Sequence, residues 1–325
     1  MKQFENLYII DQEAIKEGQE SKFGYFPDER KILDHIKYGL IVLDKHSGPT
    51  SHEIVSIVKK ILKLNKAGHS GTLDPNVTGI LPIALAKATK VLSILLESSK
   101  TYICNLHSAE SKDITEWEKI LKEYIDEIYQ VPPLKSNVVK KLRKRRIYNI
   151  EILDVIDKQI LLKIDCESGT YIRTLCVDLG KSIGSASYMR ELRRIKTGPF
   201  HENQGVTLHQ LFDAYESYKE VGDEEGLRKI IQPMENAITN VPKVVIRLNA
   251  IDPISHGTDL FVAGVIAYSD FNTGEKIAIL SPKGELIGLG TSFRSSKAFI
   301  NGDTGKIVHP EKIFVERNQF PKYQK

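Results

Sequence analysis

The stretch GHSGTLDPNVTGILP, residues 68–82, holds three glycines, two prolines and a single acidic residue, Asp74, directly before an apolar run. This composition predicts a loop that leads into a strand. Two catalytic loop patterns do not fit it. A nucleophile elbow needs glycine where Thr72 stands, and no Gly-Lys-Ser/Thr follows for a phosphate loop. A tight turn that re-aims the chain and a loop that carries catalytic residues are the alternatives left.

The residues around this loop predict a mixed α/β fold. Thr50 and Glu53 form a capping-box pattern, in which each side chain satisfies a backbone N–H at a helix start. Apolar residues then recur with helical spacing, whereas other short apolar runs are typical of buried or half-buried strands. Strands are predicted at 38–43, 80–85, 102–106 and 160–166, and helices at 28–37, 54–62, 86–96 and 172–183.

The pattern changes after Pro242. Short apolar runs at 244–248, 261–266, 276–280 and 286–289 are separated by Gly, Pro and Asn. Regular turn punctuation of this kind predicts a small β-barrel-like domain, with a boundary near residue 241.

Composition excludes several classes of protein. The chain has 325 residues, 41% hydrophobic and 27% charged, which is ordinary for a globular protein and argues against disorder. Cys104, Cys166 and Cys176 form no close pair, so buried reduced thiols are expected and no metal or cofactor is predicted. The N-terminus has no apolar signal core, and residues 79–96 are too short and too charged to cross a bilayer. These features predict a cytoplasmic protein.

The net charge of +4 conceals one basic segment. Between Glu127 and Glu151 there is no acidic residue but there are seven basic ones, and without them 39 basic residues face 42 acidic ones. Clustered like charges repel within a compact fold and indicate an external polyanion, although a solvated pair of charged strands is the plainer alternative. The seven are Lys135, Lys140, Lys141, Arg143, Lys144, Arg145 and Arg146.

Four motifs in the same order resemble those of the TruB-type pseudouridine synthases. Two further features, FPDERK at 26–31 ahead of the first strand and HGTDL at 256–260, are similar to the archaeal and eukaryotic dyskerin-like branch, the catalytic subunit of H/ACA ribonucleoproteins. The four motifs are LDKHSGPTS at 43–51, GHSGTLDPNVTGILP at 68–82, SGTYIRTL at 168–175 and ELRRIKTGPF at 191–200.

This resemblance implies an α+β architecture in three parts. An N-terminal extension, residues 1–36, is expected to pack on the C-terminal domain. Residues 37–240 are expected to form a catalytic domain whose mixed, largely antiparallel sheet is flanked by helices. Residues 241–325 are expected to form a PUA domain, an RNA-binding pseudo-barrel, with RNA contacts in residues 256–264.

The same resemblance implies the reaction and its residues. Asp74 matches the family's catalytic aspartate, Arg173 its ion-pair partner, and Tyr102 the tyrosine that stacks on the target base or acts as a general base. A neighbouring cation keeps such a carboxylate ionised. Four further residues match substrate-binding positions: His69, Lys45, Tyr171 and Leu192. His46 departs from the proline that the family has after its lysine.

The resemblance also implies partners. The basic segment corresponds to a loop that clamps RNA, with Arg193 and Arg194 along the same path, and bound phosphates would make the affinity salt-dependent. A guide RNA, a substrate RNA and accessory proteins of the Nop, Gar and kink-turn-binding families are expected. The activity implied is RNA-guided isomerisation of uridine to pseudouridine in ribosomal or transfer RNA. A stand-alone transfer RNA enzyme and a non-catalytic RNA-binding scaffold are the alternatives.

Overall fold

The computed structural model describes residues 6–132 and 139–322. By contacts it divides into two compact units. The catalytic unit takes Ile41–Ala84 and Leu92–Ile230. The C-terminal unit takes the chain up to Leu40, the short segment Leu85–Val91 and the chain from Ile231 onward.

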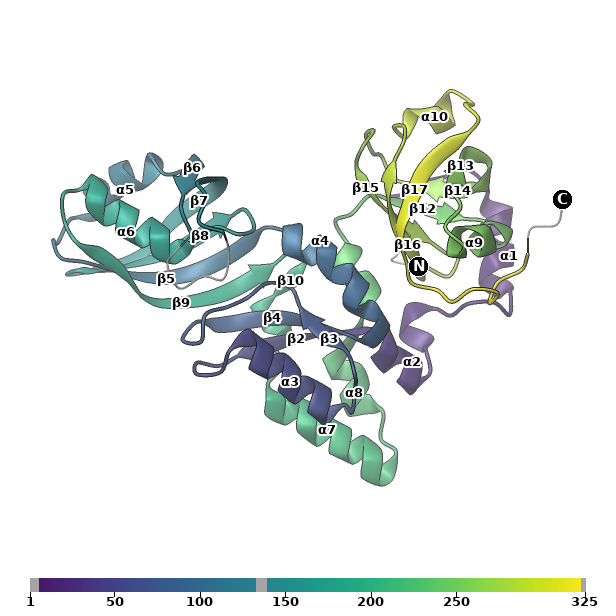
Figure 1. Cartoon of the computed structure of the whole chain (residues 1–325), viewed down its shortest axis with the longest axis horizontal. Coiled ribbons are helices and arrows are strands. Elements are labelled where there is room, and N and C mark those ends of the chain that lie inside the picture. The colour runs from purple at the N-terminus through teal and green to yellow at the C-terminus, as the bar shows by residue number, and fades with distance from the viewer. Residues whose placement is uncertain (1–5, 133–138, 323–325) are drawn as a thin grey trace. The chain divides into compact units, whose positions relative to one another are not determined.

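The catalytic unit is built on one long mixed sheet with the order β2-β4-β9-β5-β8-β7-β6 (Figure 1). Strands β5, β8, β7 and β6 pair antiparallel, and β4 and β9 pair parallel over two residues. Short strands β3 and β10 pair with β4 and β9. The strands are β2 Gly39–Lys45, β3 Ala67–His69, β4 Thr78–Leu85, β5 Lys100–Ser108, β6 Asp126–Gln130, β7 Arg143–Ile156, β8 Gln159–Cys166, β9 Ser187–Thr197 and β10 Phe200–His201.

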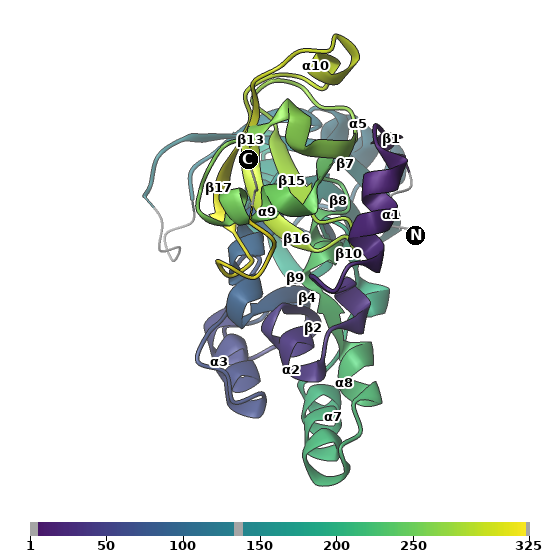
Figure 2. The same ribbon diagram turned by 90° about the vertical axis from the view of Figure 1, so that its right-hand side faces the viewer.

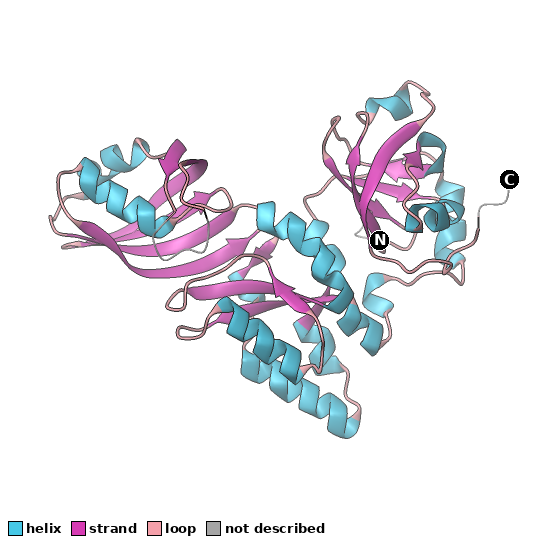
Figure 3. Ribbon diagram, viewed as in Figure 1, coloured by secondary structure: helices cyan, strands magenta, loops and turns pink. Residues whose placement is uncertain are grey.

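Helices flank this sheet, as Figure 3 shows. The predicted capping box begins α3: Thr50 N–H donates to Glu53 at 2.7 Å, and Glu53 N–H donates to Thr50 Oγ1 at 3.2 Å. Helices α5 and α6 pack on β5, β7 and β8 around the fully buried Trp117. The helices are α3 Ser51–Ile61, α4 Leu92–Glu97, α5 Ile114–Lys122, α6 Ile172–Ser182, α7 Leu208–Val221 and α8 Glu225–Ile230, with a 3-10 turn at Glu202–Gln204.

The C-terminal unit holds a seven-stranded sheet with the order β1-β14-β12-β15-β16-β17-β13. Its first strand comes from the N-terminal segment, where Tyr8 pairs with Tyr268 of β14, and α1 follows it (Figure 2). The strands of this sheet are β1 Tyr8–Ile9, β12 Lys243–Ile246, β13 Leu260–Phe261, β14 Val265–Tyr268, β15 Lys276–Leu280, β16 Leu286–Ser292 and β17 Lys306–Ile313. The short strand β11 Ile231–Pro233 is not part of it and is the neighbour of β2. The helices are α1 Gln12–Glu20, α2 Ile32–Lys37, α9 Leu248–Ser255 and α10 Lys297–Ile300, with 3-10 turns at Pro27–Glu29, Ala86–Val91, Met234–Ile238 and Val262–Gly264.

The predicted fold class, an α+β chain with a mixed sheet, flanking helices and a small β domain, is confirmed. Three local expectations differ. Helix α1 lies in a stretch for which no helix or strand was predicted, and the run 261–266 is broken by a 3-10 turn. The segment Leu85–Val91 groups with the C-terminal unit because Lys87 and Lys90 bond to Glu316 and the Ile313 carbonyl. Among the described residues, the helices include none that could span a membrane.

Candidate active site

The loop between β3 and β4 presents Asp74 to solvent on a rigid support. Leu73 is buried, and its backbone N–H and carbonyl both bond to the buried Ser51 hydroxyl, at 2.9 and 3.1 Å. The next residue is held differently: the Asp74 carbonyl accepts from Val77 N–H at 3.0 Å, while its side chain stays 49% exposed. The carboxylate is therefore both fixed and accessible.

Lys45 holds this loop from beneath. Its side chain is fully buried, and its ammonium donates to the carbonyls of His46, Pro75 and Val77 at 3.0, 2.7 and 2.9 Å. Burial lowers the pKa of Lys45, and the nearby Asp74 carboxylate partly offsets that. The predicted substrate contact needs correction, because all three donors of this lysine are used inside the protein.

Arg173 reaches Asp74 from the start of helix α6. Its Nη2 forms an ion pair with Asp74 Oδ2, and both side chains are roughly half exposed. The residue before the helix, Tyr171, is half-buried and is locked by the buried Gln130, whose side chain donates to the Tyr171 carbonyl at 3.1 Å and accepts its N–H at 3.0 Å. The predicted pairing of Asp74 with Arg173 is thus present.

Tyr102 and Leu192 lie on neighbouring strands, β5 and β9, and both pack against the core beneath α5 and α6. Both are half-buried, so each keeps one side open. Burial raises the pKa of the Tyr102 phenol, while the nearby Arg194 cation lowers it and the Asp74 carboxylate raises it. The charge of the Asp74 carboxylate therefore reaches the Tyr102 phenol.

His69 lies at the end of β3, beside the loop. Its Nδ1 accepts from Gly71 N–H at 3.2 Å, and its ring meets the His52 ring edge-on at 5.1 Å. Burial, with the charges of His52 and Arg194, lowers the pKa of His69 to about 4. A neutral imidazole can fill space or accept a hydrogen bond but gives no phosphate-binding charge at neutral pH.

Arg193 and Arg194, which were predicted to lie along the RNA path, are both engaged in contacts within the protein. Arg193 forms two hydrogen bonds of 3.0 Å with Asp44 and one of 2.9 Å with Glu202. Arg194 is only 1% exposed and donates to backbone carbonyls. The assignment of Arg194 as an RNA contact is corrected, because its side chain is buried. Arg193, which is paired with two carboxylates but partly exposed, stays a predicted RNA contact.

The basic segment is partly a strand. Lys140 and Lys141 precede β7 and are exposed, whereas Lys144 and Arg146 lie in β7 and form ion pairs with Glu127, and Arg146 also with Asp126. The acids lie near these cations because β6 pairs antiparallel with the start of β7, which places Glu127 directly opposite Arg146. Lys135 lies outside the described residues. Arg143 is half-buried in β7, and Arg145, also half-buried, lies against Gly169, two residues before Tyr171.

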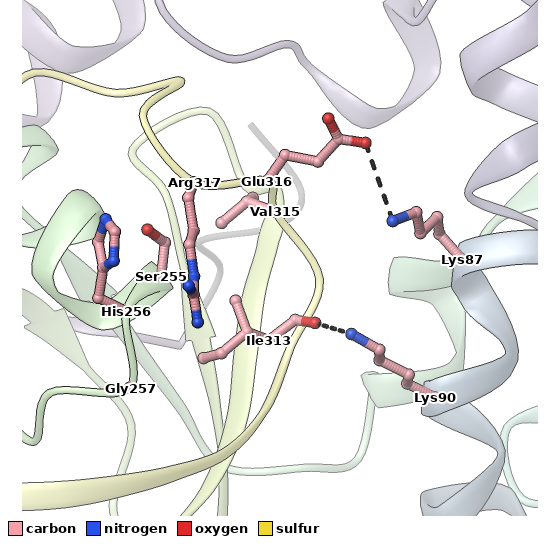
Figure 4. Close-up of a pocket in the computed structure, with 9 residues that line it drawn as sticks. All are labelled: Lys87, Lys90, Ser255, His256, Gly257, Ile313, Val315, Glu316 and Arg317. Carbon is pink, nitrogen blue, oxygen red and sulfur yellow. Dashed lines mark hydrogen bonds and ion pairs between the residues drawn. The ribbon is translucent and has the colours of Figure 1, made fainter.

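A cationic pocket of about 550 Å³ lies in the C-terminal unit (Figure 4). His256 and Arg317 face it, and across it Lys87 meets Glu316 at 3.9 Å while Lys90 donates to the Ile313 carbonyl. His256 belongs to the stretch predicted to contact RNA. Among the described residues, no group of three or more His, Cys, Asp or Glu could hold a metal ion.

Sequence reasoning missed the supporting residues Ser51 and Gln130, and it assigned Arg194 to RNA binding instead of a supporting role. Each is almost fully buried and bonds to backbone atoms of the loop, of Tyr171 or of β4. Serine, glutamine and arginine side chains are usually exposed, so no local sequence pattern predicts that these three are buried. Only their positions within or next to matched motifs could have drawn attention to Ser51 and Arg194.

Four protein-family models match successive parts of this chain. Residues 59–172 match the TruB family pseudouridylate synthase N-terminal domain, and residues 173–239 match the tRNA pseudouridylate synthase B C-terminal domain. Residues 4–55 match the DKCLD (NUC011) domain, and residues 242–314 match the PUA domain.

Relatives and solved structures match along almost the whole chain. A probable tRNA pseudouridine synthase B of Methanocaldococcus jannaschii is 44% identical over 317 residues, covering 96% of this chain and 94% of that protein. The counterpart in Methanopyrus kandleri is 42% identical over 316 residues, with the same coverage. A chain in a Cbf5-Nop10-Gar1 complex is similar at a TM-score of 0.91 and 42% identity, covering 98% of this chain and 96% of that one. A chain of an H/ACA RNP bound to a substrate RNA containing 2′-deoxyuridine gives 0.89 and 40%, covering 97% and 96%.

Proposed function

Because this chain belongs to the TruB family of pseudouridine synthases, in its dyskerin-like branch, we propose that a guide RNA directs its uridine isomerase activity to chosen sites in ribosomal RNA, with transfer RNA as a second substrate class. Pseudouridine formation breaks the N1–C1′ bond of uridine and joins C5 to C1′. C5 gives up its proton and N1 gains one. The reaction is an isomerisation, so no outside reagent is consumed.

One observation carries the catalytic assignment: Asp74 is paired with Arg173 and half exposed, on a loop fixed by Ser51 and Lys45. A carboxylate that is fixed, accessible and paired with a cation is suited to attack a glycosidic centre or to take a proton from the sugar. Tyr102, on whose phenol the Asp74 charge acts, offers both a ring for stacking and a phenol for proton transfer. His69, Tyr171 and Leu192 would line the base pocket.

The guide-dependent part rests on the whole length of the chain. The DKCLD segment, the PUA segment and the similarity to chains of H/ACA complexes extend beyond the catalytic unit. The pocket between His256 and Lys90 supplies cations suited to an RNA backbone. Partners expected on this basis are guide and substrate RNA, with accessory proteins of the Nop, Gar and kink-turn-binding families.

The decisive experiment measures tritium release from [5-³H]uridine, since C5 loses its hydrogen during isomerisation. The protein is incubated with a target RNA and either a matching guide or a guide with a scrambled pairing sequence, with and without accessory proteins of the families seen in similar complexes. Release only with the matching guide is the expected result. Release in neither arm would overturn the guided function.

A second candidate is a stand-alone transfer RNA enzyme, which the names of the curated relatives favour. The same assay separates it, because efficient release from a transfer RNA with protein alone would establish guide-independent modification. We expect that arm to be slow in comparison with the guided one.

A further inference from the structure

A second arginine lies beside the proposed catalytic tyrosine, and it has almost no exposed surface. Arg194 is 1% exposed. Its Nε donates to the Ile80 carbonyl at 2.9 Å, and its Nη2 donates to the Gly71 carbonyl at 3.2 Å. It lies directly across from Tyr102 in the pairing of β5 with β9, and its charge acts on the Tyr102 phenol. A full positive charge is thus held in the protein by neutral acceptors, in a place where charges interact strongly.

Backbone pairing fixes where this cation lies. Arg194 is opposite Tyr102 in the pairing of β5 with β9, and opposite Gly79 in the pairing of β4 with β9. At Gly79, φ is +105°, and a Cβ would lie 2.2 Å from the Arg194 carbonyl oxygen, so only glycine allows this approach of the strands. The arginine therefore joins the Asp74 loop, β4 and β5 at one point.

The same charge acts on three titratable groups around the site. Burial is the main cause that lowers the pKa of His69 to about 4 and that of Lys100 to about 8, and the Arg194 charge lowers both further. At Tyr102 burial raises the phenol pKa, and the Arg194 charge offsets part of that rise. These groups come from β3 and β5, so the influence of the cation is shared across the site.

We propose that Arg194 is a positioning residue for Tyr102, which orients the phenol and stabilises negative charge on its oxygen. Tyr102 first gives its phenolic proton to solvent. The phenolate oxygen then accepts the proton that uracil C5 releases once C5 has bonded to C1′, and N1 takes a proton from solvent, so the protons balance. The inference rests on the proposed function, because it assigns Tyr102 the proton-transfer role rather than stacking alone. Arg173 acts on Asp74, whereas Arg194 acts on Tyr102.

The test follows the Tyr102 phenol directly, without catalysis. The full chain is labelled with ¹³C at tyrosine Cζ, and the Tyr102 signal is identified by its loss in Tyr102→Phe. Arg194→Gln is expected to raise the pKa of Tyr102 by about one unit or more, the scale of losing an adjacent opposite charge. Arg194→Lys, which keeps the charge, should stay close to the parent protein. The matched control is Arg228→Gln, which removes a surface arginine paired with Glu224 on helix α8.

An unchanged Tyr102 titration in a folded Arg194→Gln protein would overturn the proposal. If that variant does not fold, Arg194→Lys and Arg194→Met carry the same comparison. The pH profile of pseudouridine formation should move to higher pH in Arg194→Gln and return towards the parent in Arg194→Lys, which a merely structural role would not produce. A parent protein that forms no pseudouridine in any arm would refute the proposed function, while the phenol titration would still report on Arg194.

Discussion

At the scale of the residue, a substitution of Asp74 should affect catalysis and leave RNA binding nearly unchanged. We expect Asp74→Asn to lower pseudouridine formation by about 10³-fold or more, because removal of a nucleophile or essential base has effects of this size. RNA affinity should stay within about twofold, since the amide has the shape of the carboxylate and the loop is held by Lys45 and Ser51. Single-turnover tritium release and filter binding measure the two. Asp178→Asn on α6 is the matched control, and retained activity in Asp74→Asn would refute the catalytic assignment.

The residue scale also shows why sequence gives only part of the site. The pairing of Asp74 with Arg173 follows from matched motifs, but the role of Lys45 does not. A lysine is normally exposed, and burial with three carbonyl acceptors depends on a loop thirty residues away. Arg194 is similar, because a basic pair at 193–194 has the pattern of an RNA contact. Tertiary structure decided both.

At the scale of the element, the basic segment holds two exposed lysines ahead of β7, Lys140 and Lys141, and a lysine within β7, Lys144, that is paired with an acid. Lys140→Gln with Lys141→Gln should flatten the salt dependence of RNA affinity by roughly 0.7 log units per lost phosphate contact, the value for single strands. Lys144→Gln should change the slope less, because Lys144 is paired with Glu127 in the β6–β7 hairpin. Binding titrations at several salt concentrations measure both. Equal slopes in all three proteins would show that Lys140 and Lys141 do not contact RNA.

Most elements were predictable because their apolar spacing is local. The strand at 276–280 and the helix that follows Thr50 are present where the pattern placed them. Helix α1 was missed, since its nine residues bury only Ile15 and Gly18. Its position depends on Pro282, which a Cβ at Gly18 would meet at 2.4 Å. A distant contact of that kind leaves no periodicity in the sequence.

At the scale of the whole molecule, a buried acid makes the stability of the C-terminal unit depend on pH. Burial raises the pKa of Glu285 to about 7, against a smaller opposing effect of Arg30, which itself forms two hydrogen bonds with Glu235. The folded state therefore keeps a proton that the unfolded chain releases above its own pKa of 4.5. Stability from this group is full below pH 4.5 and is lost as pH rises through about 7.

Glu285→Gln should accordingly raise the thermal midpoint at pH 8 and reduce the change between pH 5 and pH 8. The effect is on the order of 2–3 kcal/mol from the size of the pKa change. Thermal unfolding at both pH values measures it, with Glu20→Gln on the exposed face of α1 as the matched control. A midpoint in Glu285→Gln that falls at pH 8 would contradict the prediction.

The way the chain is shared between the two units has a further consequence. It passes from one unit to the other at four places, after Leu40, Ala84, Val91 and Ile230. A protease that nicks any single connection leaves the remaining three intact, so no unit is released as a separate fragment. Limited digestion should yield nicked protein that still migrates as one species under native conditions and separates only in denaturant. Neither half can be obtained by truncation alone, and gene fragments for either unit would have to be designed as rejoined segments.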